Sequence, residues 1–151
     1  MPSLLTDEHR SWIGKAEPPV EVEVSRRDIV KYSIATEQLQ EKYLSGDEAP
    51  PMFVFNLFAP LRRMPDIRPD GLSRGTAGPS LPLKRVMAGG TELKLHRPIR
   101  PGDRLVGTQR ITGMAEKQGS TGPLIFTERT LEVKSADGEP VFDEIQTAIA
   151  R

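Results

Sequence analysis

One apolar stretch decides the fold: Pro50-Pro51-Met52-Phe53-Val54-Phe55-Asn56-Leu57-Phe58-Ala59-Pro60-Leu61, which holds three of the chain's five phenylalanines. It is far shorter than the roughly 20 residues that span a bilayer. Periodicity alone does not separate a buried strand from a buried helix here, but paired prolines suit a first helical turn, and Pro60 limits a helix near its end. A helix without a polar stripe must be enclosed. We therefore predict an apolar helix over residues 52–61, enclosed by a curved antiparallel sheet.

The second half of the chain supplies strands for that sheet. Alternating or β-rich runs cover residues 92–96, 104–114, 124–134 and 141–149. A hairpin connection is predicted at residues 117–122, and Asp137-Gly138 is a strong short-range hairpin signal between two extended runs. Helices followed by a series of hairpins indicate an α+β fold, with the helices on one face of an antiparallel sheet.

The first half of the chain carries helix signals. Thr6 is a predicted N-cap of a short helix that ends by Gly14, and residues 21–24 alternate as a short strand. Ser25 begins a capping-box pattern, and the apolar stripe after it predicts a helix that continues to about Tyr43.

Residues 62–84 are rich in Pro, Gly, Arg and Ser and have no periodicity. A structureless stretch of this length is uncommon inside a compact domain. Two interpretations are open: an ordered surface loop that covers the edge of the sheet, or a segment that lines a binding cleft.

The composition bounds the class of protein. A length of 151 residues is most simply a single domain, residues 1–151. The charges balance at 21 basic and 21 acidic residues, so neither nucleic acid nor an anionic membrane is an expected partner. The absence of cysteine excludes disulfides and thiolate chemistry. The N-terminus has no basic region followed by an apolar run, so we expect a cytoplasmic protein.

Residues suited to catalysis are few. The chain has two histidines, His9 and His96, and the alternation of strand 92–96 places His96 on a solvated face with Glu92 and Lys94. No set of His, Asp and Glu has the spacing of metal ligands, so no metal is expected. The segment 88–90 is too short for a phosphate-binding loop, and no Gly-x-Ser-x-Gly motif occurs.

Several segments carry a resemblance to a known family: Ser11-Trp12-Ile13-Gly14-Lys15, Asp70-Gly71, Leu81-Pro82-Leu83-Lys84-Arg85, Arg85-Val86-Met87-Ala88-Gly89-Gly90-Thr91-Glu92-Leu93, Arg97-Pro98-Ile99-Arg100-Pro101-Gly102-Asp103-Arg104-Leu105, and Lys117-Gln118-Gly119-Ser120-Thr121-Gly122-Pro123-Leu124-Ile125-Phe126. Their order and spacing resemble the MaoC-like dehydratase superfamily. They are most similar to its N-terminal, FAS1-like dehydratase half. That half occurs in 3-methylfumaryl-CoA (mesaconyl-C4-CoA) hydratases and in mitochondrial-type 3-hydroxyacyl-thioester dehydratases. The likeness covers residues 12–151 approximately.

The resemblance implies a hot-dog fold, in which an antiparallel sheet wraps a long central helix. It also implies hydration of enoyl-thioesters, or dehydration of 3-hydroxyacyl-thioesters, carried on CoA or acyl carrier protein, without a further cofactor. Catalytic members carry an Asp-x4-His pair, and alignment places Gln38 and Tyr43 at these positions. Glutamine takes no proton at neutral pH, and tyrosine, with a reference pKa near 10, replaces imidazole poorly. A shifted alignment brings Glu37 or Glu41 to the acid position but no histidine to the other. The resemblance therefore implies a catalytically silent half.

Three functions remain open from the sequence. The first is the substrate-binding, non-catalytic subunit of a hydratase or dehydratase, paired with a catalytic MaoC-like chain that supplies Asp and His. The second is a homo-oligomeric hot-dog protein that binds an acyl-CoA without chemistry. The third is a hot-dog thioesterase, which needs a carboxylate on or near the central helix, where Asn56 is the polar residue.

Candidate substrate-binding residues come from the same segments. Lys84, Arg85 and Lys117 are candidates for contact with CoA phosphates, the alternative being ordinary surface charge. Ala88-Gly89-Gly90 permits the close approach of a pantetheine arm or another backbone, the alternative being a β-bulge. Asn56 is a candidate in the apolar stretch, the alternative being an amide bonded to backbone.

Overall fold

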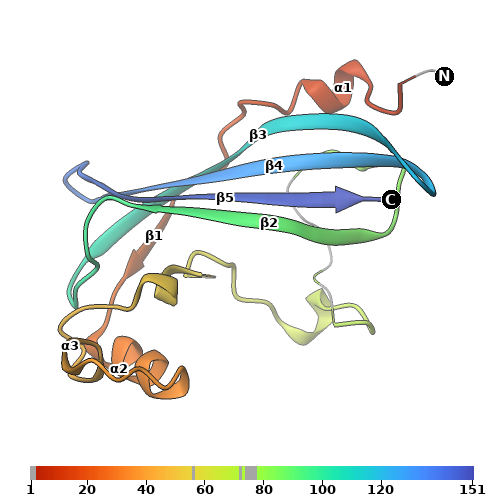
Figure 1. Ribbon diagram of the computed structural model, residues 1–151. Helices are drawn as coiled ribbons and strands as arrows, with labels where there is room; N and C mark the ends of the chain where they lie inside the picture. Colours follow the sequence, from red (N-terminus) through yellow and green to blue (C-terminus); the bar gives the residue numbers. More distant parts are fainter. Residues whose placement is uncertain (1–2, 56, 72, 74–77) are drawn as a thin grey trace.

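The computed structural model describes residues 3–55, 57–71, 73 and 78–151. Its centre is a five-stranded antiparallel sheet in the order β1-β3-β4-β5-β2 (Figure 1). The strands are β1 (Val20–Glu23), β2 (Val86–Leu95), β3 (Arg104–Gly119), β4 (Gly122–Ser135) and β5 (Pro140–Ala150). The predicted α+β fold with an antiparallel sheet is confirmed.

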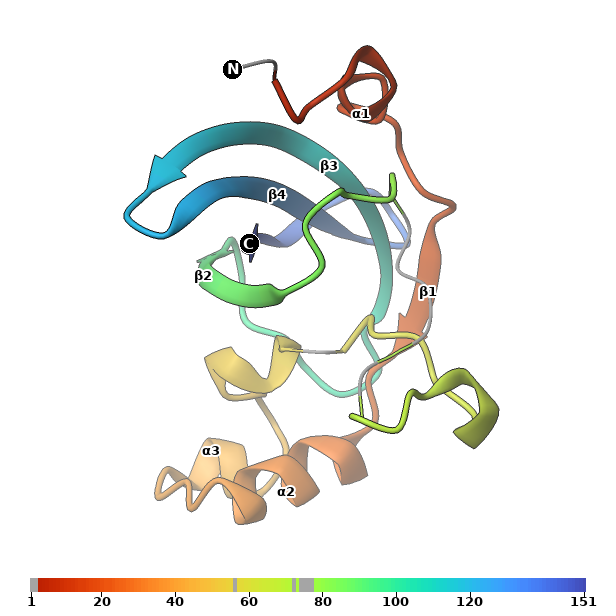
Figure 2. The ribbon, with the colours of Figure 1, turned by 90° about the vertical axis from the view of Figure 1, so that its right-hand side faces the viewer.

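The sheet curves strongly along its long strands, and Figure 2 shows β3 and β4 arching over β2, with α2 and α3 further below. Both predicted hairpins form, with Gly119 paired to Gly122 and a turn between β4 and β5. Strand β2 begins at Val86, well before the predicted residue 92, and its register shifts between Ala88 and Gly90. Of the two interpretations of this glycine pair, the structure therefore contains the β-bulge.

The helices are short and lie outside the curve of the sheet or below its open side (Figures 1 and 2). They are α1 (Asp7–Arg10), α2 (Arg26–Ala35), α3 (Glu41–Leu44) and the 3-10 turns η1 (Pro51–Val54) and η2 (Met64–Asp66). The predicted caps form, since Thr6 accepts from the N–H of His9 and Ser25 accepts from the N–H of Asp28.

The predicted continuation of α2 to Tyr43 is wrong. The helix stops at Ala35 because Glu37 adopts a left-handed conformation, with φ of 54°. The Thr36 hydroxyl also donates to the Tyr32 carbonyl at 2.8 Å, which provides a side-chain partner for the end of the helix. Tyr43 then lies in the separate helix α3.

The apolar stretch does not form the predicted helix over residues 52–61. Among its described residues the one helical element is the turn η1, in which Phe53 and Val54 are buried while Met52 is about half exposed. Phe55 is 45% exposed and Leu61 is fully exposed, so the stretch is not enclosed along its whole length. Starting a helix costs several fixed dihedrals for one hydrogen bond, and these aromatic and β-branched residues are mediocre helix formers.

Two apolar clusters hold the sheet to the segments below it. The larger surrounds Phe142, Leu105 and Ile29, each fully buried, and each such side chain contributes roughly 1.5–3 kcal/mol. In this cluster Tyr32 meets Phe53 edge-on at 5.6 Å between ring centroids. The smaller cluster lies at the other end of the sheet around Ile125, Ala150 and Leu5.

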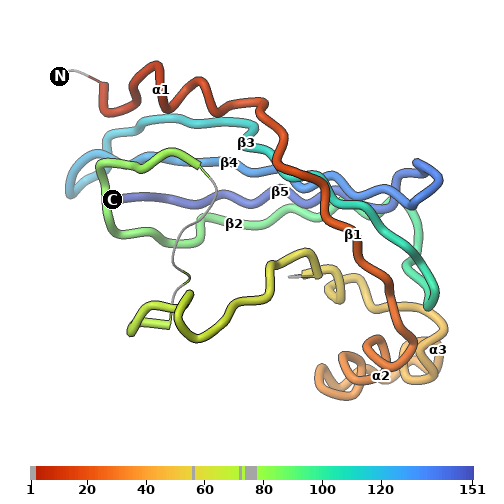
Figure 3. The backbone as a smooth tube through the Cα atoms, turned by 180° about the vertical axis from the view of Figure 1, so that it is seen from behind, coloured from red at the N-terminus to blue at the C-terminus, as the bar shows by residue number. Residues whose placement is uncertain are grey.

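The N-terminal segment runs beside β3 before it enters β1, as Figure 3 shows from behind. Ile13 bridges to Ile111, and Ala16 bridges to Arg110. The N–H of Gly14 donates to the carbonyl of Ile111 at 2.8 Å. This segment therefore covers part of the free edge of β3 beyond β1.

Candidate functional site

The concave face of the sheet is polar in its middle. Because side chains alternate along a strand, every second residue of β3, β4 and β5 points to this face. Five polar residues occupy such positions, and we call them the polar belt: Gln109, Thr127, Arg129, Glu144 and Gln146.

The strand register brings the belt together. Arg129 is paired with Gln146 across β4 and β5, and Leu131 is paired with both Glu144 and Gln109. Directly paired residues on one face have Cβ atoms about 5 Å apart. Sequence reasoning missed these residues. Their signal is a polar residue at an inward position between apolar ones, which is readable only once the register is known.

Hydrogen bonds and one ion pair organise part of the belt. The Gln146 amide donates to Glu144 Oε1 at 2.7 Å, and Glu144 is only 5% exposed. Arg129 Nη1 lies 3.4 Å from Glu17 Oε1, a carboxylate of the segment that precedes β1. Thr127 is 7% exposed, and its hydroxyl has no hydrogen-bond partner among the described residues.

Three adjoining cavities lie over the belt, and we call them together the concave groove. The largest, of about 750 Å³, lies between the β1 region and residues 57–61. A smaller one of about 200 Å³ shares Phe58, Gln109 and Leu131 with it. A third of about 450 Å³ shares Arg129 with the small one and extends below residues 78–84. Part of the predicted loop 62–84 therefore lines a cleft.

The groove is suited to binding an elongated molecule. Its walls carry apolar side chains such as Phe58, Leu131 and Met114, while the belt provides donors and acceptors. No histidine lines any of the three cavities as far as the described residues go. Nor do three His, Asp or Glu residues come together as metal ligands within that part of the chain.

Gln38 and Tyr43, which we predicted to stand at the family's Asp and His positions, line none of the three cavities of the groove. Gln38 donates to the Thr36 hydroxyl at 3.2 Å, beyond the end of α2. Tyr43 is buried in α3, with the Lys42 ammonium 4.8 Å from its ring centroid. A hydrogen bond to Glu48 raises the pKa of Lys42, so this neighbour is a cation rather than a base.

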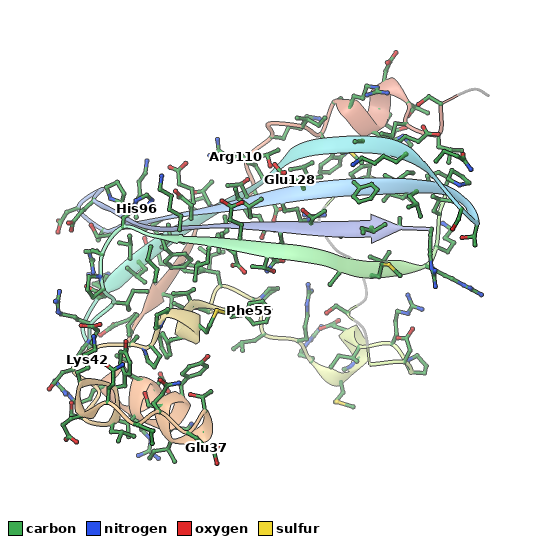
Figure 4. The ribbon with its side chains drawn as sticks, in the orientation of Figure 1. Glu37, Lys42, Phe55, His96, Arg110 and Glu128 are labelled. Atoms are coloured by element: carbon green, nitrogen blue, oxygen red, sulfur yellow. The ribbon has the colours of Figure 1, made fainter. Side chains whose placement is uncertain are left out.

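A histidine and a carboxylate do meet elsewhere. His96 Nε2 lies 2.8 Å from Asp143 Oδ2, with side chains 28% and 32% exposed. Asp143 is paired with Lys94 and alternates with the inward-facing Glu144, so the contact is on the outer face of the sheet. Figure 4 places His96 above the sheet and Phe55 below it. The predicted solvated face of strand 92–96 is thus found, and the pair does not face the groove.

The predicted substrate-binding residues are partly brought together. Lys84 and Arg85 line a common surface hollow with Thr121 and Arg151 at one end of the sheet. Lys117 lies near this end on β3, and its ammonium is 4.7 Å from the ring centroid of Phe126.

The remaining predicted binding residues are Ala88, Gly89, Gly90 and Asn56. A Cβ at Gly89 would come within 3.0 Å of Ile149, so this glycine accommodates a neighbouring side chain of the same sheet. Gly90 has open space where its Cβ would be, and Ala88 is exposed. Asn56 lies outside the described residues.

The family model for the "FAS1-like, dehydratase domain region" matches residues 11–144. This chain belongs to the FAS1-like dehydratase family. The match covers most of the sequence and includes four of the five residues of the polar belt, all but Gln146. It places the chain among the MaoC-like dehydratases and hydratases, as the sequence motifs indicate.

A curated relative supports the same family. The chain is 26% identical over 117 residues to a mesaconyl-C(4)-CoA hydratase of Chloroflexus aurantiacus, which covers 77% of this chain and 41% of the relative. The aligned part of this chain therefore spans less than half the length of that hydratase.

Solved structures establish the hot-dog fold. A MaoC-like dehydratase from Phytophthora capsici superposes with a TM-score of 0.68 at 18% identity, covering 95% of this chain and 50% of that one. The HadBC (3R-hydroxyacyl-ACP dehydratase) complex of Mycobacterium tuberculosis gives 0.64 at 14% identity, covering 92% and 97%. The ChsH1-ChsH2 complex of the same organism gives 0.64 at 15% identity, covering 89% and 83%. Within the described residues, no helix has the length and apolar character to cross a membrane.

Proposed function

We propose that this FAS1-like dehydratase chain is the substrate-binding, non-catalytic half of a MaoC-like hydratase or dehydratase, and that it pairs with a hot-dog chain that supplies Asp and His. The observation that carries the proposal is a formed groove that no described histidine lines, so that no Asp/His pair of the described residues faces it. Our alignment places Gln38 and Tyr43 at the family's Asp and His positions, and neither residue lines the groove.

The free edge of β2 is a suitable surface for binding a second chain. Among the described residues strand β2 pairs with β5 on one side only, so roughly every second one of its residues presents an unpaired N–H and C=O on the other side. Val86 is 64% exposed, and Met87 and Leu95 are each 41% exposed. The opposite edge, β1, has four residues and follows Pro18 and Pro19, which protect it from pairing. A strand of a second chain would bury the apolar edge of β2.

The neighbouring apolar side chains extend this surface. Met52 and Phe55 are about half exposed, and Figure 2 shows the η1 region just below β2 on the same side of the molecule. Two of the structural relatives are complexes, HadBC and ChsH1-ChsH2, which supports a hetero-complex over an isolated chain.

The substrate class follows from the family rather than from the groove alone. Family members act on thioesters, so the proposed ligand is an acyl chain carried by CoA or acyl carrier protein. The groove would hold the acyl part while the partner's carboxylate and imidazole exchange the proton and the water at C2 and C3. The predicted absence of a cofactor remains part of this proposal.

Mixing experiments test it. The purified chain is combined with a MaoC-like chain that carries Asp-x4-His, and hydration of crotonyl-CoA is followed by the loss of enoyl-thioester absorbance. We expect no hydration by this chain alone and a higher rate for the mixture than for the catalytic chain alone. Native mass spectrometry detects the complex. Hydration by the chain alone, or the absence of both complex and rate gain, would contradict the proposal.

A further inference from the structure

The cavity of about 450 Å³ below residues 78–84 differs in charge from the rest of the concave groove, and we call it the cationic cavity. Lys84 and Arg129 line it, and no carboxylate of the described residues does. The other two cavities have acidic residues in their walls, among them Glu144 in the small one and Glu17 in the largest. The groove therefore ends, on this side, in a space where the charged walls are positive.

The strand register places a hydroxyl and a guanidinium next to each other in this cavity. Thr127 and Arg129 are two positions apart on β4, so they point to the same face about 7 Å apart along the strand. The strand partners of Thr127 are Met114 and Ala148, and Arg129 is paired with Ile111. Two polar groups thus stand close together among apolar side chains.

The Thr127 hydroxyl indicates that this cavity serves a ligand. The residue is only 7% exposed, and its hydroxyl has no hydrogen-bond partner within the described part of the chain. Buried hydroxyls in folded proteins are nearly always hydrogen-bonded. Valine has almost the same shape and no hydroxyl, so folding alone gives no reason for threonine here. A hydroxyl can donate to an acceptor that a ligand brings into the cavity.

Lys84 gives the cavity a net positive charge. Its ammonium donates to the Leu81 carbonyl at 3.3 Å, and it forms no ion pair with any described residue. Arg129 faces Glu17 at 3.4 Å, a longer contact than the about 2.7–2.9 Å of a strong charge-assisted hydrogen bond. Even if Glu17 balanced Arg129 completely, the charge of Lys84 would remain.

The buried acid of the polar belt lies too far along the sheet to cancel this charge. Glu144 is four positions along β5 from Ala148, the residue paired with Thr127, which corresponds to about 13 Å. That separation exceeds the Debye length of about 10 Å at 0.1 M salt. At the level of Thr127, the two cations in the wall of the cavity therefore outweigh the repulsion from Glu144.

We propose that the cationic cavity binds a carboxylate at the far end of the acyl chain, so that this protein selects thioesters of dicarboxylic acids over those that end in a methyl group or a hydroxyl. The inference rests on the proposed function, because it takes the acyl chain to lie in the concave groove. Thr127 donates a hydrogen bond to the carboxylate, and Lys84 and Arg129 attract its charge. Apolar residues such as Met114 pack against the methylene groups. Thr127 and Lys84 are specificity-determining residues.

Titration calorimetry with three thioesters of equal length tests the selection: octanoyl-CoA, 8-hydroxyoctanoyl-CoA and suberoyl-CoA, which end in a methyl group, a hydroxyl and a carboxylate. All three carry the same CoA phosphates, so a difference between them arises at the acyl end. The chain is titrated alone and together with the catalytic partner. We expect suberoyl-CoA to bind about tenfold more tightly than the other two, because charge-assisted hydrogen bonds are stronger than neutral ones. The pairs hexanoyl- and adipoyl-CoA, and decanoyl- and sebacoyl-CoA, extend the comparison to shorter and longer chains.

Two variants localise the effect. Thr127→Val and Lys84→Met should each reduce the preference for suberoyl-CoA over octanoyl-CoA to less than about threefold, whereas Lys84→Arg, which keeps the charge, should retain the preference. Thr127→Val should also keep or raise the melting temperature, since it deletes an unpartnered hydroxyl. Lys31→Met is the matched control for the loss of one positive charge, because Lys31 is exposed on α2 and lines none of the three cavities. It should leave the preference unchanged.

The outcomes separate this inference from the proposed function. Equal affinities for the carboxylate and methyl esters at all three lengths, or tightest binding of the hydroxylated ester, overturn the inference and leave the proposed function intact. If Lys84→Met weakens octanoyl-CoA as much as suberoyl-CoA, Lys84 meets the CoA phosphates instead, and the inference is again overturned. A marked loss of stability in Thr127→Val would show that the fold itself uses the hydroxyl, with the same consequence. Failure of every thioester to bind, with and without the partner, overturns the proposed function and the inference with it.

Discussion

Phe58, in the segment below the sheet, lies close to Gly107 of β3, and replacing Gly107 with alanine tests whether this contact matters. A Cβ on Gly107 would lie 2.7 Å from Phe58 Cδ1 and 2.8 Å from Cε1. Carbon atoms in contact are normally 3.5–4.0 Å apart, so the ring would have to withdraw by about 1 Å. Phe58 also packs 6.1 Å from the ring centroid of Phe142. Overpacking of this kind costs about 1–3 kcal/mol.

Urea denaturation, followed by far-ultraviolet circular dichroism, measures this cost. Gly113→Ala is the matched control in the same strand, because its Cβ would meet Glu128 Cβ at an ordinary 3.7 Å. We expect Gly107→Ala to lower the free energy of unfolding by about 1–3 kcal/mol, and Gly113→Ala to change it by less than about 0.5 kcal/mol.

A double-mutant cycle decides the mechanism of the Gly107→Ala effect. If the clash with the ring is the cause, Gly107→Ala costs little in a chain that already carries Phe58→Ala, so the two changes are strongly non-additive. Equal unfolding midpoints for Gly107→Ala and Gly113→Ala would refute the reasoning. They would show that Phe58 does not pack on the sheet.

Three further perturbations follow from the contacts. Burial raises the pKa of Asp103, but the hydrogen bonds from Arg97 at 2.8 and 3.2 Å and from the Arg100 N–H outweigh it and hold the pKa below its ordinary value. Asp103→Asn should therefore lower the free energy of unfolding by about 1–3 kcal/mol at pH 7. In urea titrations, the difference in unfolding free energy between the variant and the wild type should shrink as the pH falls below about 4, because the wild-type carboxylate then becomes protonated. Ser25→Ala removes the cap of α2 and should lower the melting midpoint by the equivalent of about 1 kcal/mol, with an unchanged midpoint arguing against the cap. Met87→Lys, at a residue 41% exposed on β2, should leave unfolding unaltered but abolish the partner complex in native mass spectrometry, and a retained complex would exclude this edge as the interface.

The sheet was predictable because its signals are local. The turn at Asp137-Gly138 and the alternation along 104–114 and 124–134 depend on residues a few positions apart, and the observed β3 and β4 contain both runs. The N-caps at Thr6 and Ser25 were predictable for the same reason. The start of β2 was harder to predict from the sequence, because the first half of the strand holds glycines and a bulge that interrupt the alternation.

The apolar stretch shows where local reasoning fails. Its composition correctly predicts burial of Phe53 and Val54, but not the backbone conformation. A short run of aromatic residues between prolines lacks the hydrogen bonds to pay for helix nucleation, and tertiary packing decides its shape. The break after Ala35 has a similar cause, since the left-handed Glu37 is fixed by its surroundings rather than by a glycine that would announce it.

The candidate site was the least predictable part because it exists only through strand pairing. Arg129 and Gln146 are adjacent because β4 and β5 align in one particular register. A shift of that register by one residue would turn both side chains to the outer face. Lys84 and Arg85 were found from sequence because they are neighbours in the chain, and the structure indeed places them in one hollow.

The described residues of the apolar stretch form no long helix, and this leaves room under the sheet. A long helix under the sheet would fill the concave face and leave no room for a ligand, whereas the short η1 turn leaves adjoining cavities over the belt. The polar belt is tolerated there because the cavities keep Glu144 and Gln146 in reach of water or a bound group, so that neither is left without a partner. In the proposed function, this space under the sheet, which no described histidine lines, holds the acyl chain for chemistry that a second chain performs.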